Sequence, residues 1–278
     1  MRQVGVIGLG EMGLPMARNL VARGFAVTGY DVRPEACQAL VASGGTAARS
    51  AGDAARDRDD VVVMVRTAAQ AEQVVLGEGG VLAVARPDAT LIVMSTVGVG
   101  CMRRLGRAAR QRNLAFLDAP VSGGRARAEA GTLTVIVGGS AEDLAACRPV
   151  LGAVGSQIEH VGDVGAGTAV KMANQVLLTI SLLAAREAAE LVRDEGVSTE
   201  RLWEVIRTCT GTTWVVENWP VAARWMDDYH PGTSLDILVK DTGLALDLVR
   251  ERDLRTRLLP LTADMLRELV RDLGGQGA

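Results

Sequence analysis

The pattern that most constrains the fold of this chain is a glycine-rich loop near its N-terminus. The loop reads Gly8-Leu9-Gly10-Glu11-Met12-Gly13; it follows the β-rich run Gln3–Ile7 and opens a helix-like stretch, Met12–Arg23. In such a loop the first glycine permits a tight turn, the second lets the backbone approach a pyrophosphate, and the third lets helix and strand pack closely. The helix N-terminus offers free N–H groups to the phosphates. We therefore expect a βαβ unit whose loop, all six residues included, binds a dinucleotide.

An acidic residue stands where such a unit needs a carboxylate for the adenosine ribose. Asp31 follows the second β-rich run, Ala26–Tyr30, and lies 18 residues after Gly13. Its carboxylate would accept hydrogen bonds from the ribose hydroxyls and would repel a 2′-phosphate. Arg33, close by, would soften that preference by pairing with a phosphate. The predicted cofactor is therefore NAD, with NADP as the alternative.

Strand-like and helix-like stretches alternate through the first half of the chain. The β-rich runs are 3–7, 26–30, 61–65, 90–94, 115–117 and 133–137. Alternation with Val/Ile-rich strands predicts a parallel sheet covered by helices on both faces. Beyond residue 162 the pattern is helical, over 165–194, 199–208, 215–227, 234–252 and 259–272. The predicted fold is an α/β Rossmann-type doubly wound sheet, residues 1–162, followed by an all-α C-terminal domain, residues 163–278.

Composition and charge narrow the function classes. The formal net charge is −3, so nothing indicates nucleic-acid binding. The four cysteines are far apart and there are two histidines, so we expect no metal site; the cysteines are interpreted as buried thiols in a reducing compartment. The most apolar run, 176–185, is shorter than the ~20 residues that cross a bilayer. No signal peptide follows Met1, so we expect a cytoplasmic protein without membrane contact.

Lysine is rare in this chain. The 30 basic residues include only Lys171 and Lys240. Lysine, unlike arginine, shifts its pKa readily when it is buried and can exchange a proton. On a helix, Lys171 shares a face with Asn174 and Gln175, amid apolar neighbours. Lys171 is therefore the predicted acid/base partner of a hydride transfer; the alternative is a lysine that snorkels from the start of the helix.

A second loop lies at the predicted carboxyl edge of the sheet. Asp118–Gly124 follows the strand-like run Ala115–Leu117, and open α/β sheets bind ligands at that edge. Ser122, Gly123 and Gly124 present a hydroxyl and several N–H groups, which suit a carboxylate. The alternative interpretation is a plain hairpin loop.

Four motifs in this order resemble the β-hydroxyacid dehydrogenase family, which includes 3-hydroxyisobutyrate dehydrogenase and tartronate semialdehyde reductase. They are Gly8–Gly13, Asp118–Gly124, the stretch from Gly165 to Gln175, and Lys240-Asp241. The resemblance covers nearly the whole chain. It implies a helical domain like the C-terminal domain of 6-phosphogluconate dehydrogenase, whose first long helix helps to form a homodimer or homotetramer.

The resemblance also implies roles for individual residues. Lys171 matches the catalytic acid/base, and Ser122, Gly123 and Gly124 match the residues that bind the substrate carboxylate. Asn174, with Gln175 beside it, matches the residue that orients the substrate. The positions that match the cofactor path toward the nicotinamide are Met64, Val65, Thr96 and Lys240.

The implied reaction moves a hydride between a nicotinamide cofactor and a small β-hydroxy acid of the 3-hydroxyisobutyrate or tartronate semialdehyde type. Two other classes remain: an NADPH-dependent imine reductase, against which Lys171 and Asp31 argue, and a non-catalytic dinucleotide-binding protein. The sequence departs from the family at two places. Thr233 follows Pro231-Gly232 where relatives have an aromatic residue, and Val65-Arg66 replaces the usual Leu-Pro. Both departures bear on the identity of the substrate.

Overall fold

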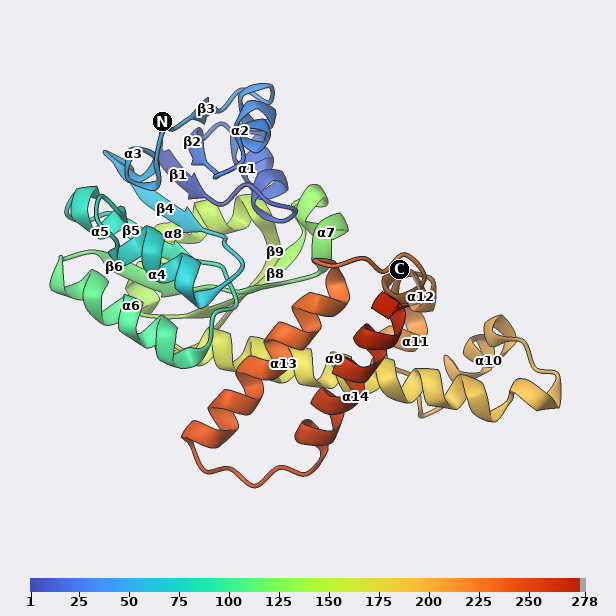
Figure 1. Cartoon of the computed structure of the whole chain (residues 1–278). Coiled ribbons are helices and arrows are strands. Elements are labelled where there is room, and N and C mark those ends of the chain that lie inside the picture. Colours follow the sequence, from blue (N-terminus) through green and yellow to red (C-terminus); the bar gives the residue numbers. More distant parts are fainter. Residues whose placement is uncertain (276–278) are drawn as a thin grey trace. The chain divides into compact units, whose positions relative to one another are not determined.

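The computed structural model describes residues 1–275, and the chain forms two compact units, Met1–Lys171 and Met172–Ala278 (Figure 1). The first unit is an α/β sheet with helices, and the described part of the second is helical. The predicted fold class, a Rossmann-type sheet followed by an all-α region, is confirmed.

The first unit is built on a nine-stranded sheet in the order β3-β2-β1-β4-β5-β6-β8-β7, with β9 paired to β8. Its strands are β1 (Gln3–Ile7), β2 (Ala26–Tyr30), β3 (Thr46–Ala47), β4 (Asp60–Val63), β5 (Thr90–Val93), β6 (Ala115–Asp118), β7 (Val121–Ser122), β8 (Leu133–Gly138) and β9 (Gly155–Gly162). The chain leaves β1 for β2 on one side and returns to β4 on the other. This reversal creates the crevice in which such sheets bind ligands, at the carboxyl ends of β1 and β4.

The expectation of a wholly parallel sheet is wrong at one edge. Strands β1 to β6 are parallel, but β8 runs antiparallel to both β6 and β7. A parallel pair needs a crossover of a dozen or more residues, and the connection from Ser122 to Leu133 is shorter than that. The chain therefore enters β8 from the edge at which β7 ends.

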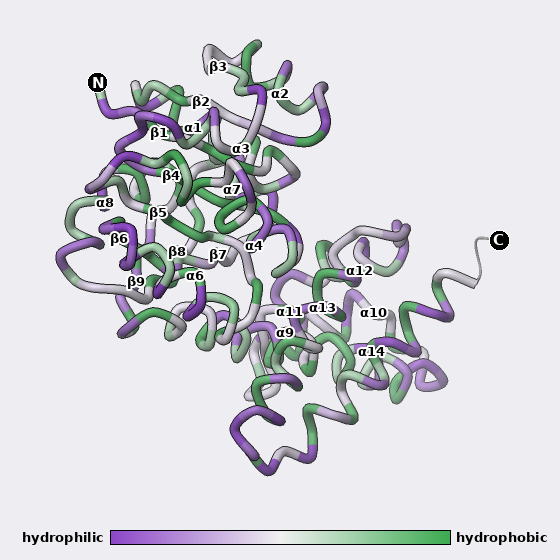
Figure 2. The backbone as a smooth tube through the Cα atoms, turned by 60° about the vertical axis from the view of Figure 1, so that its left-hand side comes forward, coloured by the Kyte–Doolittle hydropathy of each residue, from purple (hydrophilic) through white to green (hydrophobic). Residues whose placement is uncertain are grey.

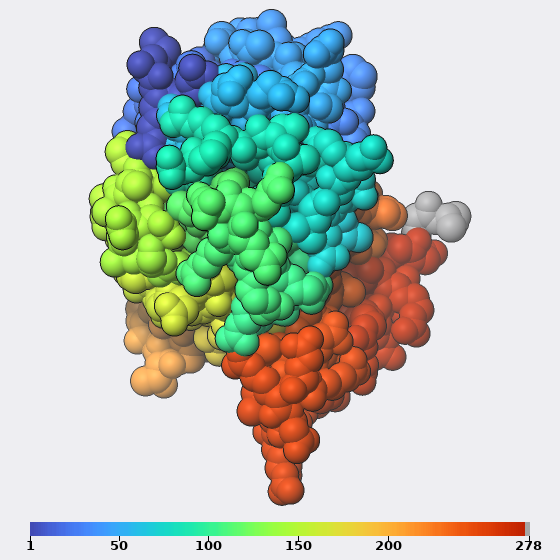
Figure 3. Space-filling model, turned by 90° about the vertical axis from the view of Figure 1, so that its left-hand side faces the viewer, coloured from blue at the N-terminus to red at the C-terminus, as the bar shows by residue number. Residues whose placement is uncertain are grey.

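Helices cover both faces of this sheet. One face packs on α1 (Gly13–Ala22), α2 (Pro34–Val41), α7 (Gly124–Ala130) and α8 (Ala141–Val154). The other packs on α3 (Ala51–Ala55), α4 (Ala68–Leu76), α5 (Val81–Val84) and α6 (Val99–Gln111). Figure 3 shows α4 to α6, in teal and green, spread over this second face. Successive residues of a strand point to opposite faces of the sheet. Val62 packs in the apolar core on the first face, and Val61 and Val63 pack in the core on the second.

The second unit packs helices around a separate apolar core. Its elements are α9 (Ala166–Leu191, which begins in the first unit), η1 (Arg193–Glu195), α10 (Thr199–Ile206), α11 (Trp214–Glu217), α12 (Trp219–Asp227), α13 (Ser234–Glu251) and α14 (Leu258–Gly275). Leu182, Trp203, Leu235 and Leu266 lie in its core, whereas the turn between α13 and α14 is hydrophilic, purple in Figure 2. The single helix predicted over 215–227 is two helices, because Pro220 suits a first helical turn but not a helix interior.

Helix α9 has the length and composition of a membrane-crossing helix, with a mean hydropathy of 1.3 in its most apolar window. The core helix of a soluble protein passes the same test, and 44% of that window is buried within the chain. The apolar run 176–185 alone therefore understated the apolar length of this helix. One such helix is nevertheless only weak evidence for a membrane span.

The interpretation of all four cysteines as buried thiols is wrong for two of them. Cys101 and Cys147 are buried in the first unit, but Cys37 is partly exposed and Cys209 is exposed. Burial raises the pKa of Cys101 to about 11 and that of Cys147 to about 12, so both remain protonated thiols. Cys209 follows α10 in a turn, where no strand or helix packs over it. All four are free cysteines.

Candidate active site

One edge of the sheet in the first unit gathers the predicted cofactor segments. Strands β1, β4, β5 and β6 are neighbours and parallel, so their carboxyl ends lie together. The glycine loop follows β1, Met64 and Val65 follow β4, and Thr96 follows β5 by three residues. The Val65 N–H donates to Oγ of buried Ser95 at 2.8 Å, which ties the ends of β4 and β5 together. Ser95 was not anticipated, because a serine after a strand has no distinctive pattern.

The glycine loop fits a bound dinucleotide. A Cβ at Gly8 would lie 2.1 Å from the Met64 carbonyl oxygen, and one at Gly13 would lie 1.9 Å from the Gly8 carbonyl oxygen. Gly8 also has a φ of 93°, which favours glycine. A Cβ at Gly10, by contrast, would meet only an Arg33 nitrogen at 3.8 Å, so the space over Gly10 is open. Helix α1 starts here without a side-chain cap, which suits the N–H groups of the loop that leads into it to phosphate oxygens.

Gly13 and Gly10 should respond differently to alanine. Gly13→Ala places a methyl group against backbone, and we expect it to destabilise the first unit by about 1–3 kcal/mol. Gly10→Ala adds a methyl group in open space, so we expect an unchanged Tm but an NADH affinity about tenfold weaker, or ~1.4 kcal/mol. Thermal unfolding and fluorescence titration of NADH measure the two effects. An unchanged Kd in Gly10→Ala would contradict the assignment of this loop.

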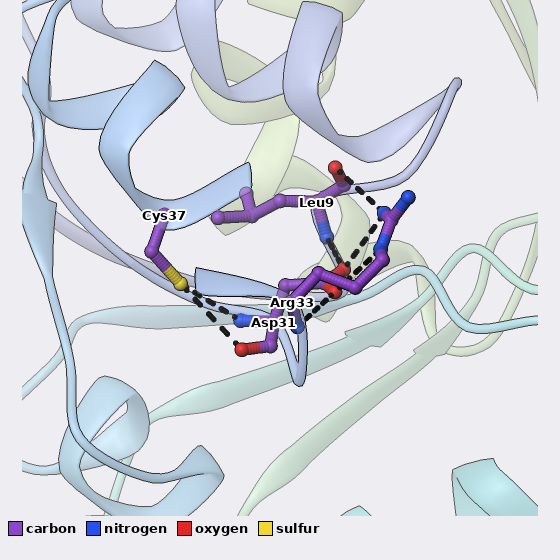
Figure 4. Close-up of polar contacts among 4 residues, drawn as sticks. All are labelled: Leu9, Asp31, Arg33 and Cys37. Carbon is purple, nitrogen blue, oxygen red and sulfur yellow. Dashed lines mark hydrogen bonds and ion pairs between the residues drawn. The ribbon is translucent and has the colours of Figure 1, made fainter. Parts of the chain in front are cut away.

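Asp31 is held rigidly beside the loop (Figure 4). Its carboxylate accepts the Leu9 N–H at 2.8 Å, the Arg33 N–H at 3.0 Å and the Arg33 Nε–H at 3.0 Å. The Asp31 N–H donates to the Cys37 sulfur at 3.3 Å. A carboxylate offers about four acceptor sites, and the Arg33 Nη2–H fills the fourth with a long contact of 3.4 Å. The Arg33 side chain is 53% exposed, so a ribose hydroxyl can replace this weakest contact.

The surroundings of Asp31 keep it ionised. Burial acts to raise its pKa, but the hydrogen bonds from the Arg33 side chain and from the Arg33 and Leu9 amides outweigh burial and lower the pKa from its ordinary 3.8. Its stabilising contribution is therefore present above the ordinary pKa and is lost as the pH falls through the lowered value. Near neutral pH the group is an anion, as ribose binding requires.

The second predicted loop presents open backbone. Gly123 has a φ of 130° and Gly124 a φ of 67°, and a Cβ at Gly124 would meet no atom within 4 Å. Ser122 ends β7 and is partly exposed, and within residues 1–275 its hydroxyl makes no protein hydrogen bond. This segment therefore has an accessible hydroxyl beside accessible amides.

Lys171 lies on α9 and is buried, with 8% of its surface exposed. It is the last residue of the first unit, and Asn174 and Gln175 follow one turn later on the same helix. Most buried lysines have a partner or a chemical role, because burying an amine is costly. This burial supports the acid/base prediction over the snorkelling alternative, which stays open.

Within the second unit, a buried carboxylate links two predicted site residues. Asp241 on α13 is 1% exposed; it accepts the Gln175 amide at 2.7 Å and the Lys240 ammonium at 2.5 Å. Gln175 in turn accepts the Asn174 amide at 3.1 Å. The contacts form one chain of polar groups, Asn174–Gln175–Asp241–Lys240. The role of Asp241 was missed, although its motif was recognised, because its partner Gln175 is 66 residues away in the sequence.

The two histidines have backbone partners. His160 contacts the Gly139 carbonyl oxygen at 2.8 Å, and His230 lies in the turn before α13. No group of three or more His, Cys, Asp or Glu that could hold a metal occurs in the part of the chain that the structure describes.

Two family models together match almost the whole chain. Residues 3–162 match the NAD binding domain of 6-phosphogluconate dehydrogenase. Residues 165–278 match the model described as NAD-binding of NADP-dependent 3-hydroxyisobutyrate dehydrogenase. Both halves therefore carry the signature of one nicotinamide-dependent family.

Curated relatives and solved structures agree with these models. The NAD-dependent L-serine dehydrogenase of Pseudomonas aeruginosa is 38% identical over 98% of this chain and 93% of its own. The L-threonate dehydrogenase of Cupriavidus necator is 38% identical over 94% of this chain and 87% of its own. A solved structure of Mycobacterium tuberculosis 3-hydroxyisobutyrate dehydrogenase with L-serine is 36% identical, with a TM-score of 0.89 over 99% of this chain and 95% of that chain. This chain belongs to the β-hydroxyacid dehydrogenase family, oxidoreductases that transfer a hydride between a nicotinamide cofactor and a small hydroxy acid.

Proposed function

We propose that this protein oxidises a small β-hydroxy acid with NAD and that Lys171 is its general base. The observation that carries the proposal is a buried lysine, Lys171, on the helix that also bears Asn174 and Gln175. In oxidation, neutral Lys171 takes the hydroxyl proton while the carbon–hydrogen electron pair leaves as hydride. The bound nicotinamide supplies the acceptor for that hydride. In reduction, protonated Lys171 returns the proton to the forming alkoxide.

The remaining site residues bind the substrate and orient it. The Ser122 hydroxyl and the amides of Gly123 and Gly124 receive the substrate carboxylate, and Asn174 donates to the substrate oxygen. The polar chain through Gln175 and Asp241 fixes the Asn174 amide and the Lys240 ammonium. The accessible hydroxyl of Ser122 and the left-handed glycines support this division of roles.

A screen of NAD reduction tests the proposal directly. The substrates are L-serine, L-threonate, 3-hydroxyisobutyrate, 3-hydroxypropionate and glycerate, the first two taken from the names of the relatives. We expect turnover on at least one of them. NADPH-dependent reduction of cyclic imines without turnover of any hydroxy acid would favour an imine reductase, and NADH binding without any turnover would favour a non-catalytic role.

We propose a preference for NAD over NADP, set by Asp31. Asp31→Ala should raise the KM for NAD about tenfold, because a hydrogen bond to a charged group is worth ~1.5–3 kcal/mol. It should also improve the use of NADP by removing repulsion of the 2′-phosphate. The measurement is the ratio of kcat/KM values for the two cofactors, with Glu35→Ala, an exposed acidic residue nearby, as the control. A ratio that Asp31→Ala leaves unchanged would refute the ribose role.

We also propose that α9 pairs with a second copy of the chain in a homodimer or homotetramer. Ala173, Leu177 and Ala184 are exposed along one side of α9, with Leu177 67% exposed. Leu177→Glu should shift the protein to monomer in light scattering at low micromolar concentration, whereas Arg186→Glu, an exposed position on the same helix, should not. A monomeric wild-type protein would contradict this proposal.

We also propose that the two halves of the chain have different roles. Residues 1–162 bind the dinucleotide, and residues 163–278 contribute substrate contacts and the subunit interface. We place the protein in the cytoplasm, a proposal that fractionation of the native cells tests.

A further inference from the structure

A buried carboxylate at the end of β6 accepts hydrogen bonds from the first turn of α9. Asp118 ends β6 and is fully buried. One of its oxygens accepts the Gly165 N–H at 2.9 Å and the Thr168 N–H at 3.0 Å, and the other accepts the Thr168 hydroxyl at 2.6 Å. These donors are the N–H groups that a helix N-terminus leaves unsatisfied, together with a hydroxyl that points the same way.

Two glycines allow this contact to be unusually close. A Cβ at Gly167 would lie 2.7 Å from the Asp118 carbonyl oxygen, and a Cβ at Gly138 would lie 2.9 Å from the Gly167 nitrogen. The start of α9 therefore rests directly on the backbone of β6 and β8. Any shift of this turn would break several contacts at once, which makes its position well defined.

The donors require an anion rather than an amide. The Gly165 amide and the Thr168 amide and hydroxyl all donate to Asp118, and the Gly167 amide also contributes. An asparagine would turn an NH2 group toward at least one of them. Burial raises the pKa of Asp118, and the hydrogen bonds from Thr168, Gly165 and Gly167 oppose that rise.

Asp118 stands between two proposed site residues of the first unit. Four residues later the same segment presents Ser122, and one helical turn beyond Thr168 lies Lys171. We propose that Asp118 is a positioning residue, which anchors the first turn of α9 so that the Lys171 amine is held at a fixed place relative to the Ser122 hydroxyl. This inference rests on the proposed role of Lys171 as general base.

A double-mutant cycle tests the inference. Asp118→Asn is measured in the wild-type background and in Lys171→Ala, with the hydroxy acid that gives turnover in the screen. Misplacement of a reacting group by about 1 Å can cost ~10²-fold in rate. We expect Asp118→Asn to lower kcat by roughly 10–10²-fold, to leave the KM for NAD unchanged within about twofold, and to have almost no effect on the residual kcat of Lys171→Ala.

Thr168 supplies a milder variant that should fold if Asp118→Asn does not. Thr168→Val removes the hydroxyl donor alone, and we expect a smaller fall in kcat, which Thr168→Ser restores. The matched control is Asp60→Asn. Asp60 is also a fully buried carboxylate of the same sheet, but it lies at the start of β4 and pairs with Arg2. Asp60→Asn should lower Tm and have little effect on kcat in either background.

The outcomes separate the inference from the proposal on which it rests. An equal loss of kcat from Asp118→Asn in both backgrounds, or a loss confined to Tm, would show that Asp118 is merely structural and would overturn the inference alone. Near-normal kcat in Lys171→Ala would overturn the proposed function and this inference together.

Discussion

Replacing Lys171 by alanine should lower kcat by ~10²–10⁴-fold, the range that general acid–base catalysis contributes. In the proposed reaction this amine takes the hydroxyl proton, and no other lysine lies within the segment Met1–Lys171. NADH affinity should remain unchanged, because the proposal assigns binding of the dinucleotide to the glycine loop and Asp31. Steady-state kinetics and a fluorescence titration of NADH measure the two quantities separately.

The control for this variant is Arg186→Ala, an exposed cation on the same helix. It should leave kcat unchanged, which separates loss of the amine from a general effect of altering α9. If Lys171→Ala kept near-normal turnover, Lys171 would be removed from the mechanism. A large loss of NADH affinity would instead indicate that Lys171 binds the cofactor.

Asp241→Ala should destabilise the second unit and lower kcat/KM together. It removes the carboxylate that accepts from the Gln175 amide and the Lys240 ammonium, and a hydrogen bond to a charged group is worth ~1.5–3 kcal/mol. Lys240 is 31% exposed and can reach water, so most of the cost should come from Gln175. Thermal unfolding measures the stability, and the KM for the hydroxy acid reports the loss of order in Asn174.

Asp241→Asn distinguishes charge from hydrogen bonding in this network. It keeps one carbonyl oxygen for Gln175 but removes the anion beside Lys240. We expect most of the stability to return while kcat/KM stays low, because Lys240 loses its ion pair. Full recovery of kcat/KM in Asp241→Asn would show that the charge of Asp241 is unnecessary.

Much of the fold follows from local patterns. The strands β1 and β2 have the bounds that the sequence predicts, and α9, α10, α13 and α14 begin within one residue of their predicted starts. Hydrophobic periodicity acts within one element, so it can be recognised without knowledge of its partners. β3, β7 and β9 were not predicted, since β3 and β7 have only two residues each and β9 is mostly exposed.

Some features of the candidate site could likewise be predicted from local sequence, whereas others could not. The glycine loop, Asp31 and the rare lysines were recognisable because their spacing along the chain carries the information. Asp118 was recognised as part of a motif, but its hydrogen-bond partners Gly165 and Thr168 lie 47 and 50 residues away in the sequence. A carboxylate has no local signature that tells which distant amide it will meet.

By itself the sequence determined the alternation of the main strands and helices, the dinucleotide loop and the two lysines, because each depends on residues that are near neighbours in the chain. Only the tertiary structure decided the antiparallel course of β8, the burial of Lys171 and the partners of Asp118 and Asp241. Those features depend on which segments meet when the sheet and the helices pack, and burial and hydrogen bonding between distant residues are set at that stage.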